Sequence, residues 1–182
     1  PYMSVRLVYI LNVKFINYPD VNLYLHYYIP ISLAMTKKWF EKVVLDESRI
    51  DLIIETFEQK PIGIIGLLEI DKENRNAQIY VTIGEKDYWG KGIAQSAVKL
   101  LLDYAFGHLR LNRIYCWTEA NNKSSQKVFE SVGFKREGVL RKHIYKRRNQ
   151  KYVDLIYYGI LNSEYHSKKS LNVWDNEALY ET

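Results

Sequence analysis

The chain has 182 residues, of which 47% are hydrophobic and 26% are charged, and its formal net charge is +5 at pH 7. This length and balance are typical of one globular domain and exclude an intrinsically disordered chain. No run approaches the roughly 18–20 apolar residues that a membrane span needs, and the first residues do not have the pattern of a signal peptide. We therefore expect a cytoplasmic protein without a membrane partner.

Cysteine and histidine give no indication of a disulfide or a metal site. Cys116 is the only cysteine, which excludes an internal disulfide. Its place in the run Arg-Ile-Tyr-Cys-Trp-Thr predicts a small buried strand residue rather than a nucleophile. The histidines do not have the spacing of metal ligands, so we expect no metal. They are His26, His108, His143 and His166.

The first 45 residues predict one strand and two helices. Residues 5–9 are predicted as a strand, and residues 17–20 as a turn before a short helix that runs through Tyr24. Ser32 is predicted as the N-cap of a second helix. The apolar residues of that helix share one face: Trp39, Phe40 and Val43.

The middle of the chain predicts three strands and then a helix. Residues 51–57 and 61–70 flank a short hairpin loop at residues 58–60, and residues 78–83 form a third strand. The period then changes to that of a helix, which Gly107 is expected to end. Its apolar face consists of Ala94, Ala97, Val98, Leu101, Leu102 and Ala105.

The last part predicts a strand at 113–118, a helix at 124–132, and two strands at 139–145 and 152–161. Gly133 is expected to stop the helix, with Phe134 making the hydrophobic contact of a Schellman-type cap. The order of elements predicts an α/β fold, with a mainly antiparallel sheet of about six or seven strands and about four helices on both faces. We expect a single domain over residues 1–162 and a peripheral tail over residues 163–182.

Residues 88–94, Tyr-Trp-Gly-Lys-Gly-Ile-Ala, lie between a strand and a long helix. Glycine and alanine at alternating positions let the backbone approach a ligand, and the free N–H groups and the dipole of the next helix favour an anion. Lys91 adds a cation. The run is neither a Walker loop nor a dinucleotide fingerprint. It predicts either a pyrophosphate site or a tight turn.

A second polar run, residues 121–125, precedes the short helix that Gly133 stops. Asn122 or Ser125 in it could cap that helix. This run follows the strand that should lie beside the one leading into the glycine-containing run. Two neighbouring strand ends that each lead into a helix form a cleft in which α/β sheets bind ligands.

These runs resemble two signatures of the GNAT acetyltransferases. Residues 83–94 are similar to the acetyl-CoA loop, whose pattern is Arg/Gln-x-x-Gly-x-Gly/Ala: Gly92 and Ala94 match its last two positions. Trp89 stands at the Arg/Gln position, as in the branch with ribosomal-protein N-terminal and spermidine acetyltransferases. Asn122-x-x-Ser125 and the following residues 128–134 resemble that branch's second signature. The resemblance covers about residues 50–162.

The resemblance implies a GNAT-type mixed sheet, acetyl-CoA as co-substrate, and direct transfer of its acetyl group to a primary amine in a ternary complex. It implies that Thr82 and Ile83 contact the pantetheine arm, and that Asn122 and Ser125 lie near the thioester. It also implies a set of residues around the pyrophosphate: Trp89, Gly90, Lys91, Gly92, Ile93, Ala94 and Gln95.

Two residues are candidates for proton transfer. Glu119, just past a predicted strand, is a candidate base; it could equally be a solvated carboxylate in a turn. Many relatives use a tyrosine as the acid, but Phe129 stands at that position, so Ser125 is our candidate acid. Asp154 begins the last strand and could pair with a cation of the hairpin. These assignments stay open at the level of the sequence.

The acceptor surface in this family comes from segments that correspond to residues 17–45 and 141–154. Both are rich in tyrosine and the second is basic, and neither gathers the carboxylates that a polyamine site needs. This composition favours a protein N-terminus or an amino-sugar over spermidine.

Two other classes of function are a non-catalytic sensor and a nucleic-acid-binding protein. Phe129, and Ser96 in place of an acid common in the branch, are compatible with a non-catalytic module that senses acyl-CoA. A nucleic-acid partner is not expected, because the basic run at 146–151 offers few cations and no aromatic platform. The sequence leaves a homodimer open.

Overall fold

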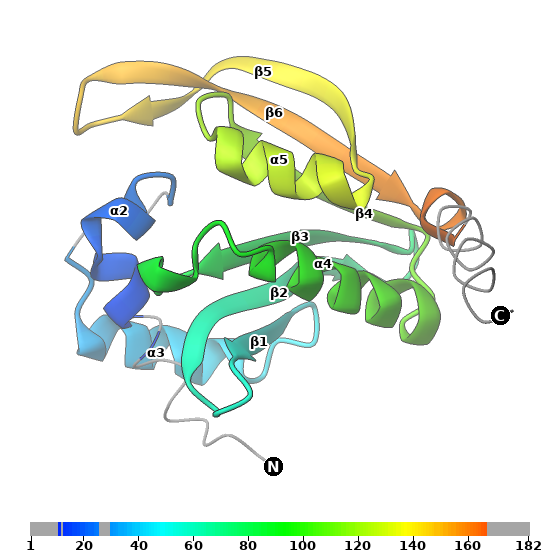
Figure 1. Ribbon diagram of the computed structural model, residues 1–182, viewed down its shortest axis with the longest axis horizontal. Helices are drawn as coiled ribbons and strands as arrows, with labels where there is room; N and C mark the ends of the chain where they lie inside the picture. The colour runs from blue at the N-terminus through cyan, green and yellow to red at the C-terminus, as the bar shows by residue number, and fades with distance from the viewer. Residues whose placement is uncertain (1–10, 12, 26–29, 167–182) are drawn as a thin grey trace, which may run out of the picture. The chain divides into compact units, whose positions relative to one another are not determined.

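The computed structural model describes residues 11, 13–25 and 30–166 (Figure 1). The predicted strand at residues 5–9 and most of the predicted tail lie outside the described residues. The chain divides into two compact units, each described below by itself. Unit 1 consists of Pro1–Ile70 and Gln78–Leu101, and unit 2 of Asp71–Ala77 and Leu102–Thr182. The single domain expected over residues 1–162 stays a prediction.

The strands of unit 1 follow the sequence prediction closely. β1 (Ile50–Glu55) pairs antiparallel with β2 (Pro61–Asp71), with Ile53 opposite Ile64. β2 lies next to β3 (Asn76–Ile83). The first two residues of β3, 76 and 77, belong to unit 2. The loop at 56–60 turns on Gln59, whose φ of 61° is left-handed. Burial alternates in the first half of β3, as expected when one face packs on the core, whereas β2 has runs of adjacent buried residues.

The helices at the start of unit 1 differ in part from the prediction. Residues 13–17 are helical, which the sequence pattern did not indicate. Tyr18 is extended, and Pro19 opens α2 (Pro19–Asn22), so the predicted short helix ends before Tyr24. Proline is favoured at the first helical position because its missing N–H has no partner there. The side chain of Asn17 joins this region to Ile31 by two hydrogen bonds, 3.0 and 2.8 Å long.

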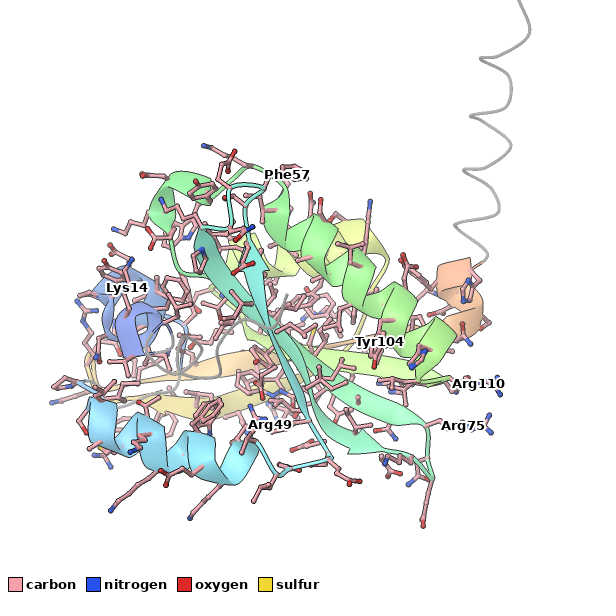
Figure 2. The ribbon with its side chains drawn as sticks, turned by 90° about the horizontal axis from the view of Figure 1, so that it is seen from below. Lys14, Arg49, Phe57, Arg75, Tyr104 and Arg110 are labelled. Carbon is pink, nitrogen blue, oxygen red and sulfur yellow. The ribbon has the colours of Figure 1, made fainter. Side chains whose placement is uncertain are left out.

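α3 (Leu33–Val43) confirms the predicted second helix. The Ser32 hydroxyl accepts a hydrogen bond of 3.1 Å from the backbone N–H of Met35, as expected of an N-cap. The predicted apolar face is half-buried along its length. Arg49, labelled in Figure 2, follows this helix and lies 5.2 Å from the centre of the Trp39 ring. Its guanidinium also pairs with Asp51 in β1 through two hydrogen bonds of 2.7 Å.

α4 (Ile93–Asp103) confirms the long amphipathic helix, but its predicted end is wrong. The helix continues as a π-helical turn, Tyr104–His108, so Gly107 lies inside the turn and does not stop it. The backbone N–H of Leu109 donates to the carbonyl of Tyr104, five residues earlier, at 3.1 Å. The change of direction comes three residues after Gly107, at Arg110, whose φ is 54°.

Unit 2 contains three strands in the order β4-β6-β5. β4 (Arg113–Glu119) and β5 (Lys135–Lys146) each pair antiparallel with β6 (Lys151–Leu161). The register of β5 shifts twice, between residues 136 and 138 and between residues 140 and 144. Figure 1 shows β5 and β6 as one long, curved hairpin. Every pairing with a stated register is antiparallel, which confirms the predicted mainly antiparallel α/β fold.

α5 (Lys123–Val132) ends as predicted. Gly133 has a φ of 113°, and the N–H of Phe134 donates to the carbonyl of Phe129 at 3.1 Å. The rings of Phe129 and Phe134 meet edge to face, with centroids 5.1 Å apart, which is the hydrophobic contact expected of this cap. Tyr158 of β6 donates a hydrogen bond of 2.7 Å to Glu130, so the helix is tied to the sheet of its own unit.

Two turns of unit 2 are joined through the backbone. The N–H groups of Asn112 and Arg113 both donate to the carbonyl of Arg75, at 2.7 and 3.2 Å. Arg75 and Arg110 themselves have left-handed φ angles, and Figure 2 shows both side chains projecting outward. These bonds explain why residues 71–77 group with β4 rather than with the strands that flank them in the sequence.

Each unit has its own buried apolar residues. In unit 1, Phe15 is fully buried in a cluster with Leu11 and Val21, on which Leu25 and Ile53 pack. In unit 2 the core is formed by residues of the π-helical turn, the strands and α5. They include Phe106, Ile114, Phe129, Val132, Leu155 and Ile160.

Gly84→Ala is expected to lower the free energy of unfolding by about 1–3 kcal/mol, because the added methyl group would overlap the buried ring of Phe15. Urea denaturation of the two proteins measures the difference. Gly138→Ala is the control, since no heavy atom lies within 4 Å of its added carbon. Equal stability of Gly84→Ala and the native protein would contradict the packing of Phe15 on residue 84.

Candidate functional site

We call residues 89–95 the glycine loop. Gly90 and Gly92 have φ angles of 71° and 76°, a left-handed conformation that costs other residues roughly 1–2 kcal/mol. α4 begins directly afterwards at Ile93, and the N–H of Ser96 donates to the carbonyl of Gly92 at 3.0 Å. The earlier N–H groups of this first turn have no acceptor within the helix. Such N–H groups at the start of a helix favour an anion, so the predicted pyrophosphate site stays a prediction.

Trp89 joins the glycine loop to the end of β3. Its indole N–H donates to the carbonyl of Ile83 at 2.8 Å, while 44% of the residue stays exposed. The Lys86 ammonium lies 6.0 Å from the centre of the same ring. The side chain at the Arg/Gln position of the family pattern thus holds the loop in place rather than providing a charge.

Three lysines surround the aromatic residues of the glycine loop. Lys91 and Lys60 have their ammonium groups 5.3 and 5.2 Å from the ring centre of Tyr88, at the distance of cation–π contacts. Lys60 comes from the β1–β2 loop and was missed by the sequence analysis, because its neighbour lies 28 residues further along the chain. Together with Lys86 these side chains add positive charge beside the exposed N–H groups of the loop.

All residues predicted to contact the pantetheine arm and the pyrophosphate lie in unit 1, in one continuous path from the end of β3 into the first turn of α4. The carbonyl of Ile83 is already engaged by Trp89, whereas Thr82 lies half-buried in β3. The left-handed glycines, the first turn of α4 and the lysines fit an elongated anion such as the pyrophosphate of CoA.

The N-terminal helical region is anchored to the segment that enters the glycine loop. Lys14, labelled in Figure 2, forms an ion pair with Glu85, 2.5 Å long, and Asp20 pairs with Lys86. The ring of Phe15 packs against residue 84. The first part of the predicted acceptor segment, residues 17–45, is therefore adjacent to the loop within unit 1.

Unit 2 holds the candidate proton-transfer residues. Glu119, the last residue of β4, has a side chain that is only 1% exposed and forms an ion pair with Lys146. Among the described residues it is the only buried carboxylate. The alternative of a solvated turn carboxylate is therefore wrong. Lys146, the last residue of β5, is 18% exposed.

The turn after β4 is fixed by α5. The Gln126 amide donates to the carbonyls of Glu119 and Ala120, at 2.9 and 3.0 Å. Asn122 is the N-cap of the helix, since its side chain accepts a hydrogen bond of 3.1 Å from the backbone N–H of Ser125. The cap uses the backbone N–H of Ser125 and not its hydroxyl, so helix capping does not account for the presence of a hydroxyl group at this position.

Three other residues singled out in the sequence have structural positions. Phe129 is buried against Phe134 and carries no proton to donate. Burial raises the pKa of the Cys116 thiol well above its ordinary value, and the Glu137 carboxylate raises it further, so the thiol is not a nucleophile. Asp154 accepts a hydrogen bond of 2.7 Å from the backbone N–H of Lys142, where the register of β5 shifts.

No group of three metal-ligating side chains occurs in the part of the chain that the structure describes. None of its described helices is both long enough and apolar enough to span a membrane.

The chain matches known proteins over most of its described length. Residues 10–135 match a family model described as an acetyltransferase (GNAT) domain. The uncharacterized N-acetyltransferase p20 of Bacillus licheniformis is 36% identical over 118 residues, which are 65% of this chain and 64% of that protein. The match thus spans less than two thirds of that relative. A spermidine N(1)-acetyltransferase of Vibrio cholerae is 29% identical over 69% of this chain and 71% of its own length.

The fold also occurs in solved structures. The spermidine N-acetyltransferase of Vibrio cholerae in complex with CoA and spermine superposes with a TM-score of 0.79, at 26% identity. The superposition covers 89% of this chain and 92% of that one.

Gly92→Ala is expected to raise the Kd for CoA roughly tenfold, because a left-handed alanine costs about 1–2 kcal/mol and each 1.4 kcal/mol is a factor of ten. Titration calorimetry with CoA measures the change. Gly107→Ala serves as the control, since its added carbon meets no heavy atom within 4 Å. Unchanged affinity in Gly92→Ala would mean that the loop conformation is not used for binding.

Proposed function

The chain belongs to the GNAT acetyltransferase family, and from this premise we propose that it transfers the acetyl group of acetyl-CoA to a primary amine. The observation that carries the proposal is the glycine loop, with two left-handed glycines directly before α4. This loop supplies N–H groups and lysines for the pyrophosphate. The matching family, and its relatives among the spermidine acetyltransferases, are those that the sequence predicted.

The reaction is a direct attack of a neutral amine on the thioester. The nitrogen forms a bond to the acetyl carbon, the carbon–sulfur bond breaks, and one proton passes overall from nitrogen to the departing sulfur. Binding both substrates in the right geometry supplies part of the acceleration, as much as ~7–11 kcal/mol in favourable cases. The protein's remaining task is to receive one proton and to donate another.

We assign these proton transfers to the same residues that the sequence indicated. Ser125 is proposed to donate to the thiolate, because its hydroxyl is not used by the helix cap and Phe129 cannot take that role. Glu119 is proposed to receive the proton of the amine. It is the buried carboxylate of unit 2, and it forms an ion pair with Lys146.

The acceptor is proposed to carry a single amine, as a protein N-terminus or an amino-sugar does. Residues 141–154 contain six lysines and arginines and one carboxylate, a balance that repels a polyamine. An α-amine, with a pKa of about 8, also has a neutral fraction at pH 7 roughly 250 times that of a lysine-type amine of pKa about 10.4. The relatives named as spermidine acetyltransferases support the opposite choice, so a panel of amines must decide.

Ser125→Ala is expected to lower kcat by roughly 100-fold and to leave the Kd for acetyl-CoA within about twofold, because a general acid acts on the leaving group and not on binding. Steady-state kinetics and calorimetry measure the two quantities. Asn122→Ala is the matched comparison: it removes the cap and is expected to cost about 1 kcal/mol of stability. An unchanged kcat in Ser125→Ala would remove this residue from the mechanism.

Acetyl-CoA is expected to bind with micromolar affinity and to release free thiol when peptides with a free N-terminus or glucosamine are added. Spermidine is expected to react more slowly. Calorimetry followed by a thiol assay, with each amine in turn, tests both statements. A micromolar KM for spermidine would overturn the acceptor class. Binding without turnover on any amine would favour an acyl-CoA sensor, and the absence of binding would reduce the glycine loop to a turn.

A further inference from the structure

The ion pair between Glu119 and Lys146 differs from other ion pairs of the chain in its burial. The side chains of Asp51, Glu85 and Glu164 also pair with cations, but they keep 18%, 19% and 27% of their surface exposed. Glu119 keeps 1%. Withdrawing a carboxylate from water to this extent costs several kcal/mol unless a cation accompanies it.

The two partners are held very differently. The backbone of Glu119 is fixed by the Gln126 amide, and the next N–H, that of Ala120, donates to the carbonyl of Asp154 at 2.9 Å. Lys146 ends β5 just before the turn at residues 147–150, and its charge sits at the end of a long, flexible side chain. The backbone that carries the carboxylate is therefore fixed by these bonds, whereas the position of the ammonium changes with rotation about the bonds of the lysine side chain.

A lysine ammonium and a protonated primary amine are the same chemical group. Replacing one by the other at Glu119 keeps the buried carboxylate compensated before and after the exchange. The exchange therefore avoids the cost of an uncompensated buried charge. Once such an amine is bound, transfer of one proton from its nitrogen to the carboxylate leaves two neutral groups. That transfer produces the neutral amine that the reaction requires.

We propose that Glu119 is the ammonium subsite for the acceptor, and that Lys146 is its internal occupant, which the acceptor displaces. The inference rests on the proposed function, because it names the ligand that this carboxylate binds during acetyl transfer. It makes Lys146 a positioning residue that competes with the acceptor. A primary ammonium can donate hydrogen bonds to the carboxylate, as the Lys146 ammonium does, whereas a quaternary ammonium has no N–H to donate.

Two substitutions of Lys146 should act in opposite directions. Lys146→Met removes the competitor and should lower the Kd for n-propylammonium, and the KM for the acceptor, at least tenfold. Lys146→Arg keeps the charge, but an arginine binds a carboxylate through two parallel hydrogen bonds and is harder to displace. The Kd for n-propylammonium and the KM for the acceptor should therefore both rise several-fold, with kcat unchanged. A purely structural ion pair predicts no such opposition, since both variants would lose stability and neither constant would move.

The experiment measures n-propylammonium binding from the rise in Tm at constant ionic strength, with tetramethylammonium as the reference cation. Lys127→Met, an exposed lysine of α5, is the matched control and should bind as the native protein does. The double variant Glu119→Gln, Lys146→Met should not respond to n-propylammonium. Equal binding by Lys146→Met and Lys127→Met, or retained binding by the double variant, would overturn the proposal.

If Lys146→Met does not fold, Lys146→Arg decides alone, because it keeps the ion pair: an unchanged Kd and KM would overturn the proposal. The binding measurement does not depend on turnover. A native protein that acetylates no amine would remove the proposed function, whereas an active enzyme with unaltered constants in both variants would remove only the subsite.

Discussion

A carboxylate that is buried away from water needs a cation beside it, and in unit 2 the buried carboxylate of Glu119 has the ammonium of Lys146. Glu119 ends β4, and its partner Lys146 ends β5, with all of α5 between them in the sequence. α5 closes the arrangement, because Gln126 binds the turn that carries the carboxylate. The length of β5 and the placement of the helix both follow from bringing that lysine to that carboxylate.

Unit 1 is organised by a different constraint, the left-handed backbone of the glycine loop. Two left-handed φ angles within three residues need support from outside the loop, and Trp89 supplies part of it. The N-terminal helical region supplies another part through Lys14 and Phe15. A segment that the sequence made hard to interpret thus serves to hold the entry to the cofactor loop.

Local signals made much of the fold predictable. The Ser32 cap, the Gly133 stop with its Phe129–Phe134 contact, and the strand periods each depend on residues close together in the chain. The predicted helix end at Gly107 was wrong, because a π-helical turn continues through this glycine, which has open space around it. The helix at residues 13–17 was missed because its stabilising contacts, with residues 84 and 85, lie some seventy residues away.

The residues of the candidate site were also predictable only where the signal lies in neighbouring residues of the chain. The glycine loop was found from its own run of residues, and so was the Asn122 cap. Lys60 and Lys146 were missed, because each acts on an aromatic ring or a carboxylate from another part of the chain. A pattern along one sequence does not contain such pairings. The extent of the domain and the roles of Glu119 and Ser125 stay predictions.

The two register shifts of β5 have a consequence for how copies of this chain meet each other in concentrated solution. β5 pairs with β6 along one side, and no strand lies on its other side among the described residues. A straight strand of that length would offer a template for intermolecular β-sheet growth. The bulges interrupt the regular hydrogen-bonding edge, and the repeated lysines and arginines along it repel a second copy. Unit 2 therefore carries its own protection against edge-to-edge aggregation, built into the hairpin that supplies Lys146.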